Sequence, residues 1–298
     1  MAEPTVSASS IAESSVIHDL GYRRYDGPRE GARGAFHALT WQGVRALLGI
    51  GRPLKAKVVP IFVTVVSMLP GLAAVAAAGA SGGQIPIRYG ATLGPQLIMF
   101  ILLGAAQAPE LFSRDQQHRV LPLYFTRDIT RNQYSAARLL ALFTVMFAIC
   151  LAPLLLLYIG EIGIAKEPAK TFAEMRGKIG PVLALATATA WVIATVSALL
   201  ASLTSRRAYA TAAIIAAFLV TSGVVSGLHD VAGVPEAITT VANPLQGHRT
   251  LSLMLFGETT RAMELTPPPD VWVFLVSYFG VGVAATAALV WRIRRMSV

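Results

Sequence analysis

Few residues of this sequence are arranged for chemistry. It contains no Gly-x-x-x-x-Gly-Lys-Ser/Thr phosphate loop, so we expect no nucleotide site of that kind. The five histidines lie in separate segments, and the single cysteine, Cys150, excludes an intrachain disulfide and a multi-cysteine metal site. A metal site built from His229, Asp230 and His248 is the one conceivable exception. We therefore predict no catalytic residue, metal or cofactor on this chain.

The composition explains why reactive groups are scarce. Of the 298 residues, 54% are hydrophobic and 14% are charged, whereas roughly a quarter are charged in an ordinary soluble domain. Six windows of about 20 mainly apolar residues are each long enough to cross a hydrocarbon core of about 30 Å. These windows are residues 58–80, 90–112, 139–160, 179–203, 208–228 and 271–291. The sequence therefore predicts an all-α polytopic membrane protein with six transmembrane helices.

Lysine and arginine are distributed unequally between the two sides of these spans. Eighteen of the 25 lie before the first span, in the loops after the second and fourth spans, or in the tail 292–298. Cytoplasmic segments carry such an excess, so we predict a multi-pass protein of the cell membrane with both termini in the cytoplasm. The net charge of +9 follows from this topology, and we do not expect nucleic-acid binding.

The residues before the first span form two parts. Residues 1–34 are polar and predict a cytoplasmic tail, whose arginines can contact lipid phosphate or an acidic protein surface. Residues 35–57 begin with a stretch that places Phe36, Leu39 and Val44 near one helical face. This pattern predicts an amphipathic connecting helix at the cytoplasmic membrane interface, followed by a linker. Packing against a soluble partner is the alternative.

The predicted cytoplasmic loop 113–138 is longer than a simple connection needs. It mixes five arginines with an apolar cluster formed by Val120, Leu121, Pro122, Leu123, Tyr124 and Phe125. An apolar knob framed by charges suits the docking of another protein, because the knob supplies buried area and the charges fix orientation. A cluster lying flat on the bilayer is the alternative. Glu110, near the end of the second span, is expected either to reach water or to pair with Arg114 or with an arginine of the preceding interfacial helix.

The predicted external segment 229–270 is long enough to need structure of its own. Two moderately apolar stretches, 235–242 and 251–256, are separated by a predicted turn over 243–247. Neither stretch can span a membrane alone. We therefore expect two short helices before the sixth span, which either re-enter the outer leaflet or cap the surface.

Most polar residues inside the predicted spans are uncharged amides and hydroxyls. Ion relays use buried carboxylates or histidines, and apart from Glu110 near the end of the second span the predicted spans contain none, which disfavours ion-coupled transport. The amides and hydroxyls of Gln96, Gln107, Thr221 and Ser222 are the polar groups best suited to a substrate path. Hydrogen bonding between helices is the alternative role for each of them.

In the order of its parts, the chain resembles the ABC transporter type-2 permease family, the transmembrane subunits of bacterial ABC exporters. The resemblance covers nearly the whole chain. Its most specific stretch is 110–134, where Ser113-Arg114-Asp115, Leu121-Pro122-Leu123-Tyr124, Thr126-Arg127 and Arg131-x-x-Tyr134 look like the family's cytoplasmic loop. The segment 22–29 is similar to the start of many bacterial permeases of this group.

The resemblance implies a permease subunit that moves an amphiphilic or hydrophobic substrate across the cytoplasmic membrane. The permease would form a homodimer, or a heterodimer with a related permease, and two copies of a separate ATPase subunit would bind ATP and Mg. In the family the loop after the second span couples to the ATPase, and the second and fifth spans line the dimer interface. The coupling residues here would be Glu110, Arg114, Asp115, Leu121, Pro122, Leu123, Tyr124, Arg127, Arg131 and Tyr134. An ion-independent secondary carrier or a non-transporting membrane scaffold is the alternative.

Overall fold

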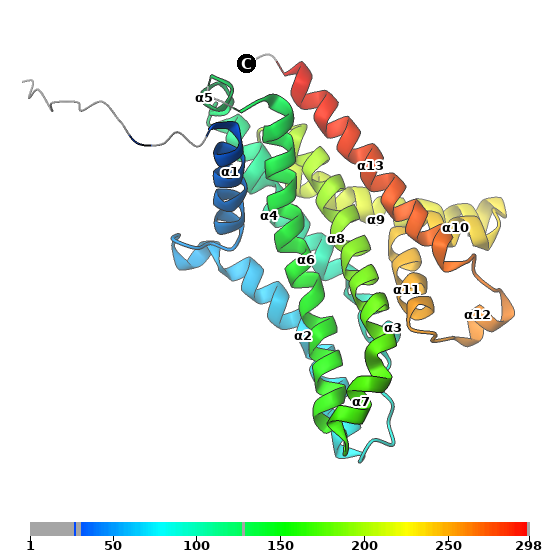
Figure 1. The fold of residues 1–298 in the computed structure, drawn as a ribbon. Coiled ribbons are helices and arrows are strands. Elements are labelled where there is room, and N and C mark those ends of the chain that lie inside the picture. The colour runs from blue at the N-terminus through cyan, green and yellow to red at the C-terminus, as the bar shows by residue number, and fades with distance from the viewer. Residues whose placement is uncertain (1–26, 28–30, 127–128, 297–298) are drawn as a thin grey trace, which may run out of the picture. The chain divides into compact units, whose positions relative to one another are not determined.

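The structure is a computed structural model that describes residue 27 and residues 31–126 and 129–296. Every regular element within these ranges is a helix, and no strand occurs in them (Figure 1). Six helical segments are long and apolar enough to cross a membrane. The prediction of an all-helical chain with six candidate membrane spans is therefore confirmed.

Each of the six candidate spans overlaps one predicted window, but the second, third and fourth extend beyond theirs. The six spans are α2 (Val58–Ala80); α3 (Tyr89–Leu93), η3 (Gly94–Gln96) and α4 (Leu97–Gln117) in succession; α6 (Arg131–Ile164); α7 (Pro168–Glu174), η4 (Met175–Lys178) and α8 (Ile179–Ser202) in succession; α9 (Arg207–Ala232); and α13 (Val271–Arg295). The helix α8 lies at the centre, because it packs against α4, α6, α9 and α13. By contrast, α2 and α9 bury few of their residues.

Small residues allow α8 to take this central position. Its fully buried alanines are Ala186, Ala188, Ala190, Ala194, Ala198 and Ala201. Gly104 of α4 lies so close to α8 that an added Cβ would come within 2.7 Å of Ile193 and Ser197. Close helix approach through small residues is typical of membrane proteins, where packing rather than water exclusion drives helix association.

The segment 113–138 is not the long loop that we expected. The helix α4 continues to Gln117 and α6 already begins at Arg131, so the short helix α5 (Leu121–Phe125) lies in a much shorter connection. Thr130 caps α6, because its hydroxyl accepts from the backbone N–H of Gln133 while the Gln133 side chain accepts from the backbone N–H of Thr130. The prediction ended the helices where the apolar residues end, whereas capping and ion pairs extend them further.

Three short helices precede the sixth span: α10 (Glu236–Ala242), α11 (Pro244–Leu255) and α12 (Arg261–Leu265). The turn expected over 243–247 is confined to Asn243, whose side chain accepts from the backbone N–H groups of Leu245 and Gln246. Gly247 lies inside α11, where an added Cβ would meet the Thr240 carbonyl oxygen at 2.8 Å. The glycine therefore serves the close packing of α10 on α11 and does not form a turn.

The helix α1 (Gly31–Leu47) begins before the predicted residue 35. Its apolar residues Leu39, Val44 and Leu47 are buried, because α1 packs on α6 and α4. The apolar face that we expected to meet a membrane or a soluble partner is therefore covered by this chain's own helices. A short 3₁₀ helix, η2 (Leu54–Ala56), then leads into α2.

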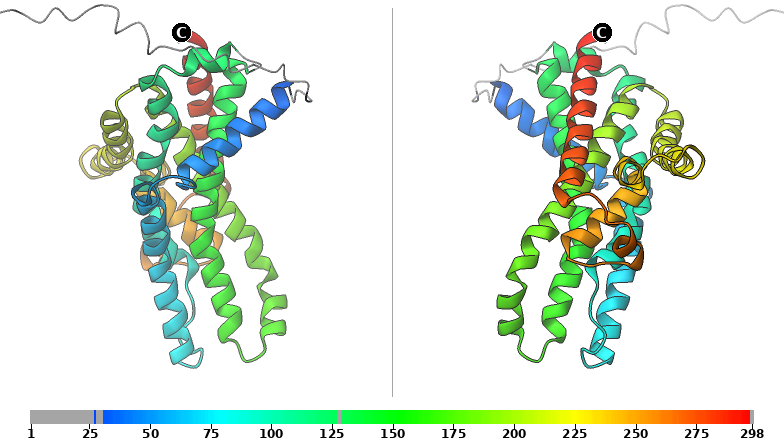
Figure 2. Two further views of the ribbon diagram at one scale, coloured as in Figure 1. Left: turned by 90° about the vertical axis from the view of Figure 1, so that its left-hand side faces the viewer. Right: turned by 90° about the vertical axis from the view of Figure 1, so that its right-hand side faces the viewer.

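The helix α5 and the last residues of α4, α8 and α13 lie together at one end of the bundle, whereas α9 runs across the other spans (Figures 1 and 2). At this end the Ser202 carbonyl accepts from Gln116 of α4 and from Arg292 of α13, both at 3.0 Å. The turns at 81–88 and 165–167 lie at the opposite end. We call the first end, with α5 and the last residues of α4, α8 and α13, the basic end.

Candidate functional site

A buried ion pair joins α4 to α6 at the basic end. Arg138 donates from Nη2 to Asp115 Oδ2 at 2.8 Å, and its side chain is only 2% exposed. The Tyr134 hydroxyl donates to the same carboxylate oxygen at 2.9 Å. Residues 134 and 138 are four apart on α6 and therefore share the face that meets α4. A charge buried this deeply depends on such partners for its compensation.

The same guanidinium also connects α1 and α5. Its Nη1 donates to Gln42 Oε1 of α1 at 2.7 Å, and its Nη2 donates to the Tyr124 hydroxyl of α5 at 3.1 Å. Burial raises the pKa of the Tyr124 hydroxyl, although the nearby guanidinium opposes this shift, so the hydroxyl stays protonated. One arginine therefore links four helices. We call Gln42, Asp115, Tyr124, Tyr134 and Arg138 the Arg138 network.

The helix α5 exposes only part of the apolar cluster that the sequence suggested as a docking knob. Leu121 is 8% exposed and belongs to the hydrophobic core. Tyr124 is half-buried and turned towards the Arg138 network. Leu123, in contrast, is 65% exposed, and Pro122 beside it is also exposed. The surface that α5 offers to another protein is therefore formed by Pro122 and Leu123.

Two other predicted coupling residues have different surroundings. Arg131 donates to the backbone carbonyls of Arg294 and Met296, both at 2.6 Å, and so fastens the end of α13 to the start of α6. Arg127 lies outside the described residues. Arg131 is thus engaged within the chain through its Nη1, and its side chain is partly buried.

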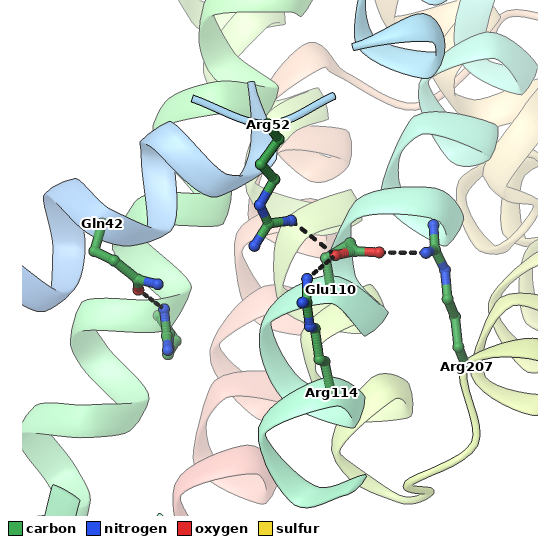
Figure 3. A network of polar contacts seen from close by, with 6 residues as sticks. Gln42, Arg52, Glu110, Arg114 and Arg207 are labelled. Atoms are coloured by element: carbon green, nitrogen blue, oxygen red, sulfur yellow. Dashed lines mark hydrogen bonds and ion pairs between the residues drawn. The ribbon is translucent and has the colours of Figure 1, made fainter. Parts of the chain in front are cut away.

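A second cluster surrounds Glu110 (Figure 3). Its Oε2 accepts from Arg52 at 3.1 Å and from Arg114 at 3.2 Å, and its Oε1 pairs with Arg207 at the start of α9. The predicted pairing with Arg114 is confirmed, and Arg52 lies in the linker between α1 and α2. Arg207 was missed because it lies at the start of the fifth span, far away in sequence. We call these four residues the Glu110 cluster.

The Glu110 cluster lines a pocket of about 450 Å³ between the start of α2, α4 and α9. Its other walls are Gln107 and the small or apolar residues Ala46, Pro53, Ala56, Val59 and Ala106. One carboxylate cannot neutralise three guanidinium groups. Among the described lining residues the pocket therefore has an excess of positive charge.

The four residues predicted for a substrate path do not share one hollow within a single chain. Gln107 is buried beside the Glu110 cluster, whereas Thr221 lines a separate apolar pocket of about 430 Å³. Gln96 is buried and donates to a backbone carbonyl one turn earlier, at 3.2 Å. The Ser222 hydroxyl accepts from the Leu245 backbone N–H at 3.4 Å. Ser222 thus makes a hydrogen bond between helices, which we gave as the alternative, whereas Gln96 bonds only within its own helical segment.

The three residues considered for metal binding are not grouped. His248 is buried in α11, where its Nδ1 lies 3.4 Å from the Thr189 hydroxyl, and burial lowers its pKa to about 4. His229 is exposed at the end of α9 and contacts the Val234 carbonyl oxygen. Within the described ranges, no three His, Cys, Asp or Glu side chains are placed to bind a metal ion.

Gln42 and Arg138 were not predicted as site residues. The only local signal was the spacing of Tyr134 and Arg138, which places an arginine and a tyrosine on one face of a helix. The partners Gln42 and Asp115 come from other helices, and nothing in the local sequence specifies that pairing.

Comparison of the chain with protein-family models and with curated proteins found no match. The resemblance to type-2 permeases therefore depends on the residues and the order of the helices alone.

Proposed function

We propose that this chain is the transmembrane permease subunit of an ATP-driven exporter of the ABC type-2 class, and that α5 docks a separate ATPase subunit. The observation that supports this most is the attachment of α5. Its outer surface offers the exposed Leu123, while its inner surface is fixed by Tyr124 to the buried Arg138. A helix exposed on one side and fastened on the other is suited to receive a push and pass it on.

The Arg138 network explains how such a push would travel. Arg138 and Asp115 are buried and hydrogen-bonded, so separating them is costly, and α4, α5 and α6 should move as a unit. Gln42 adds α1 to this unit. Closure of the ATPase dimer would then produce a rigid-body movement of these helices, which is the kind of motion that switches a cavity between two faces.

The dimer that this function requires would use α9. This helix buries few residues within the chain, and Leu219, Val220 and Val224 are exposed along it. Gly223 and Gly227, at the spacing that permits close helix approach, have open space where a Cβ would lie. In our proposal two chains meet along the second and fifth spans, and Gln107 and Thr221 face the shared path.

In this proposal the other elements of the chain have the roles that the resemblance to type-2 permeases implies. The helix α1 serves as the connecting helix, with its exposed Trp41 at the level of the lipid headgroups of the cytoplasmic leaflet. The helices α10 and α11 re-enter the outer leaflet or cap the outer surface, both termini are cytoplasmic, and ATP and Mg bind the partner subunit. The cargo is amphiphilic or hydrophobic, because Gln107 and Thr221 are uncharged.

The competing functions are an ion-independent carrier and a membrane scaffold without transport. Neither needs an ATPase, so the presence of an ATP-binding partner discriminates between them and our proposal.

The test is isolation of the tagged chain from its own membranes, followed by measurement of ATP hydrolysis in the isolated complex. Leu123→Asp should lose the ATPase without loss of membrane insertion, because Leu123 contributes little to the fold at 65% exposure. Leu203→Asp is the matched control, since Leu203 is also exposed at the basic end but lies outside α5. Equal ATP hydrolysis with both variants would contradict docking at α5.

A further inference from the structure

The pocket beside Glu110 has an unbalanced charge. Arg52, Arg114 and Arg207 each reach Glu110 through a single nitrogen, Nη1. Each guanidinium has five N–H donors, so most donors are left for another acceptor. Among the described residues, Glu110 is the only carboxylate paired with these three arginines. The cluster is therefore suited to bind an additional anion.

The geometry favours an oxyanion with several acceptors. Arginine forks match the oxygens of phosphate and can bind them in pairs. Arg114 and Arg207 are about half exposed, whereas Glu110 beneath them is mostly buried at 15%. A phosphate can therefore approach the arginines from the open side, opposite to Glu110.

The rest of the pocket indicates that this phosphate belongs to a lipid. Val59 in the first turn of α2 lines the pocket, and its neighbours Val58, Ile61 and Phe62 are exposed. These residues begin a candidate membrane span that is only 22% buried. Basic pockets between transmembrane helices at the cytoplasmic side are typical sites of anionic headgroups. Acyl chains can lie along the exposed face of α2, which a soluble anion would not use.

We propose that the Glu110 cluster binds the phosphate of an anionic membrane lipid, with Glu110 as an internal counter-ion that competes with it. This inference goes beyond the permease proposal, because it requires no ATPase. A soluble phosphate ester has the same oxyanion chemistry, and the experiment below separates the two sources.

The experiment titrates the full-length purified protein, in neutral detergent, with dioleoylphosphatidylglycerol and counts bound lipid by native mass spectrometry. We expect Arg52→Gln/Arg207→Gln to weaken binding at least about tenfold, because two charge-assisted contacts are lost while Glu110 keeps Arg114. The matched control is Arg206→Gln/Arg295→Gln, which removes two charges at the basic end from residues that contact Tyr209 and Trp291 instead. Equal weakening by both double variants would overturn the proposal.

A second variant should change the affinity for the lipid in the opposite direction. Glu110→Gln removes the competing carboxylate and should tighten phosphatidylglycerol binding about fivefold, as expected for one opposing charge removed at close range in a wet pocket. If the double variant fails to fold, this measurement still decides, since weaker or unchanged binding would contradict the proposal. Dioleoylphosphatidylcholine and glycerol phosphate should bind much more weakly than phosphatidylglycerol. Equal binding of glycerol phosphate would assign the pocket to a soluble anion and refute the lipid site.

Discussion

At the scale of single residues, Arg138 is a charge inside the protein that depends on Asp115. We expect Asp115→Ala to lower the free energy of unfolding by about 3–5 kcal/mol, because the guanidinium would remain buried without its counter-ion. Arg114→Ala is the control, since it removes an exposed arginine from a surface pair and should cost under about 1 kcal/mol. Unfolding of the purified protein in mixed micelles measures both values. A loss for Asp115→Ala no larger than for Arg114→Ala would show that the pair does not stabilise the basic end.

His248 should make the free energy of unfolding depend on pH. Burial lowers its pKa in the folded state to about 4, from an ordinary value of 6.5. Between these two pH values the unfolded chain binds more protons than the folded chain. The contribution of His248 to the free energy of unfolding is therefore complete above about pH 6.5, and it falls as the pH drops towards 4. Over this pH range the free energy of unfolding should change by about 3 kcal/mol because of His248.

The measurement is the unfolding free energy at several pH values for His248→Gln and for His229→Gln. His248→Gln should flatten the profile between pH 6.5 and 4.5 more than His229→Gln, which replaces an exposed histidine. A profile that keeps its slope in His248→Gln would show that another group is responsible.

At the scale of elements, the turn between α10 and α11 depends on Asn243. Its Oδ1 accepts from the first N–H groups of α11, and its Nδ2 donates to Ser222 and Ser226 of α9. Asn243→Ala should destabilise α10 and α11 by about 1–2 kcal/mol, the usual cost of a lost cap. Hydrogen exchange should then accelerate over 236–255. Thr260→Ala removes the cap of α12 and should accelerate only 261–265; the same pattern in both variants would contradict an anchoring role for Asn243.

The helices were predictable from sequence where apolar length alone defines them. The first span was predicted at both ends, because apolar residues begin at Val58 and stop at Ala80. The end of α4 and the start of α6 were not predicted, because polar residues extend both helices towards the basic end. In the site, Glu110 and Arg114 were predicted because their four-residue spacing is local. Arg207 was not, because only the packed helices bring it to Glu110.

At the scale of the whole molecule, the sidedness of the bundle can be measured directly. Single cysteines at His118 and Lys170, in a Cys150→Ala background, replace exposed residues near the two ends. An impermeant thiol reagent should label them from opposite sides of the membrane, with His118→Cys reached only from the cytoplasm. Labelling of both from the same side would refute the six-span topology.

The most direct test of the proposed permease function is a crosslink from α5 to its partner in native membranes. A cysteine at Leu123, in the Cys150→Ala background, should form a short-range thiol crosslink to a polypeptide that contains a phosphate loop. ATP binding should change the yield, because closure of the ATPase dimer would move the dock. The cysteine at Lys170, at the opposite end, should give no such product. Absence of any ATP-binding polypeptide from the Leu123→Cys product, or its equal capture from Lys170→Cys, would contradict the proposal that α5 couples this chain to an ATPase.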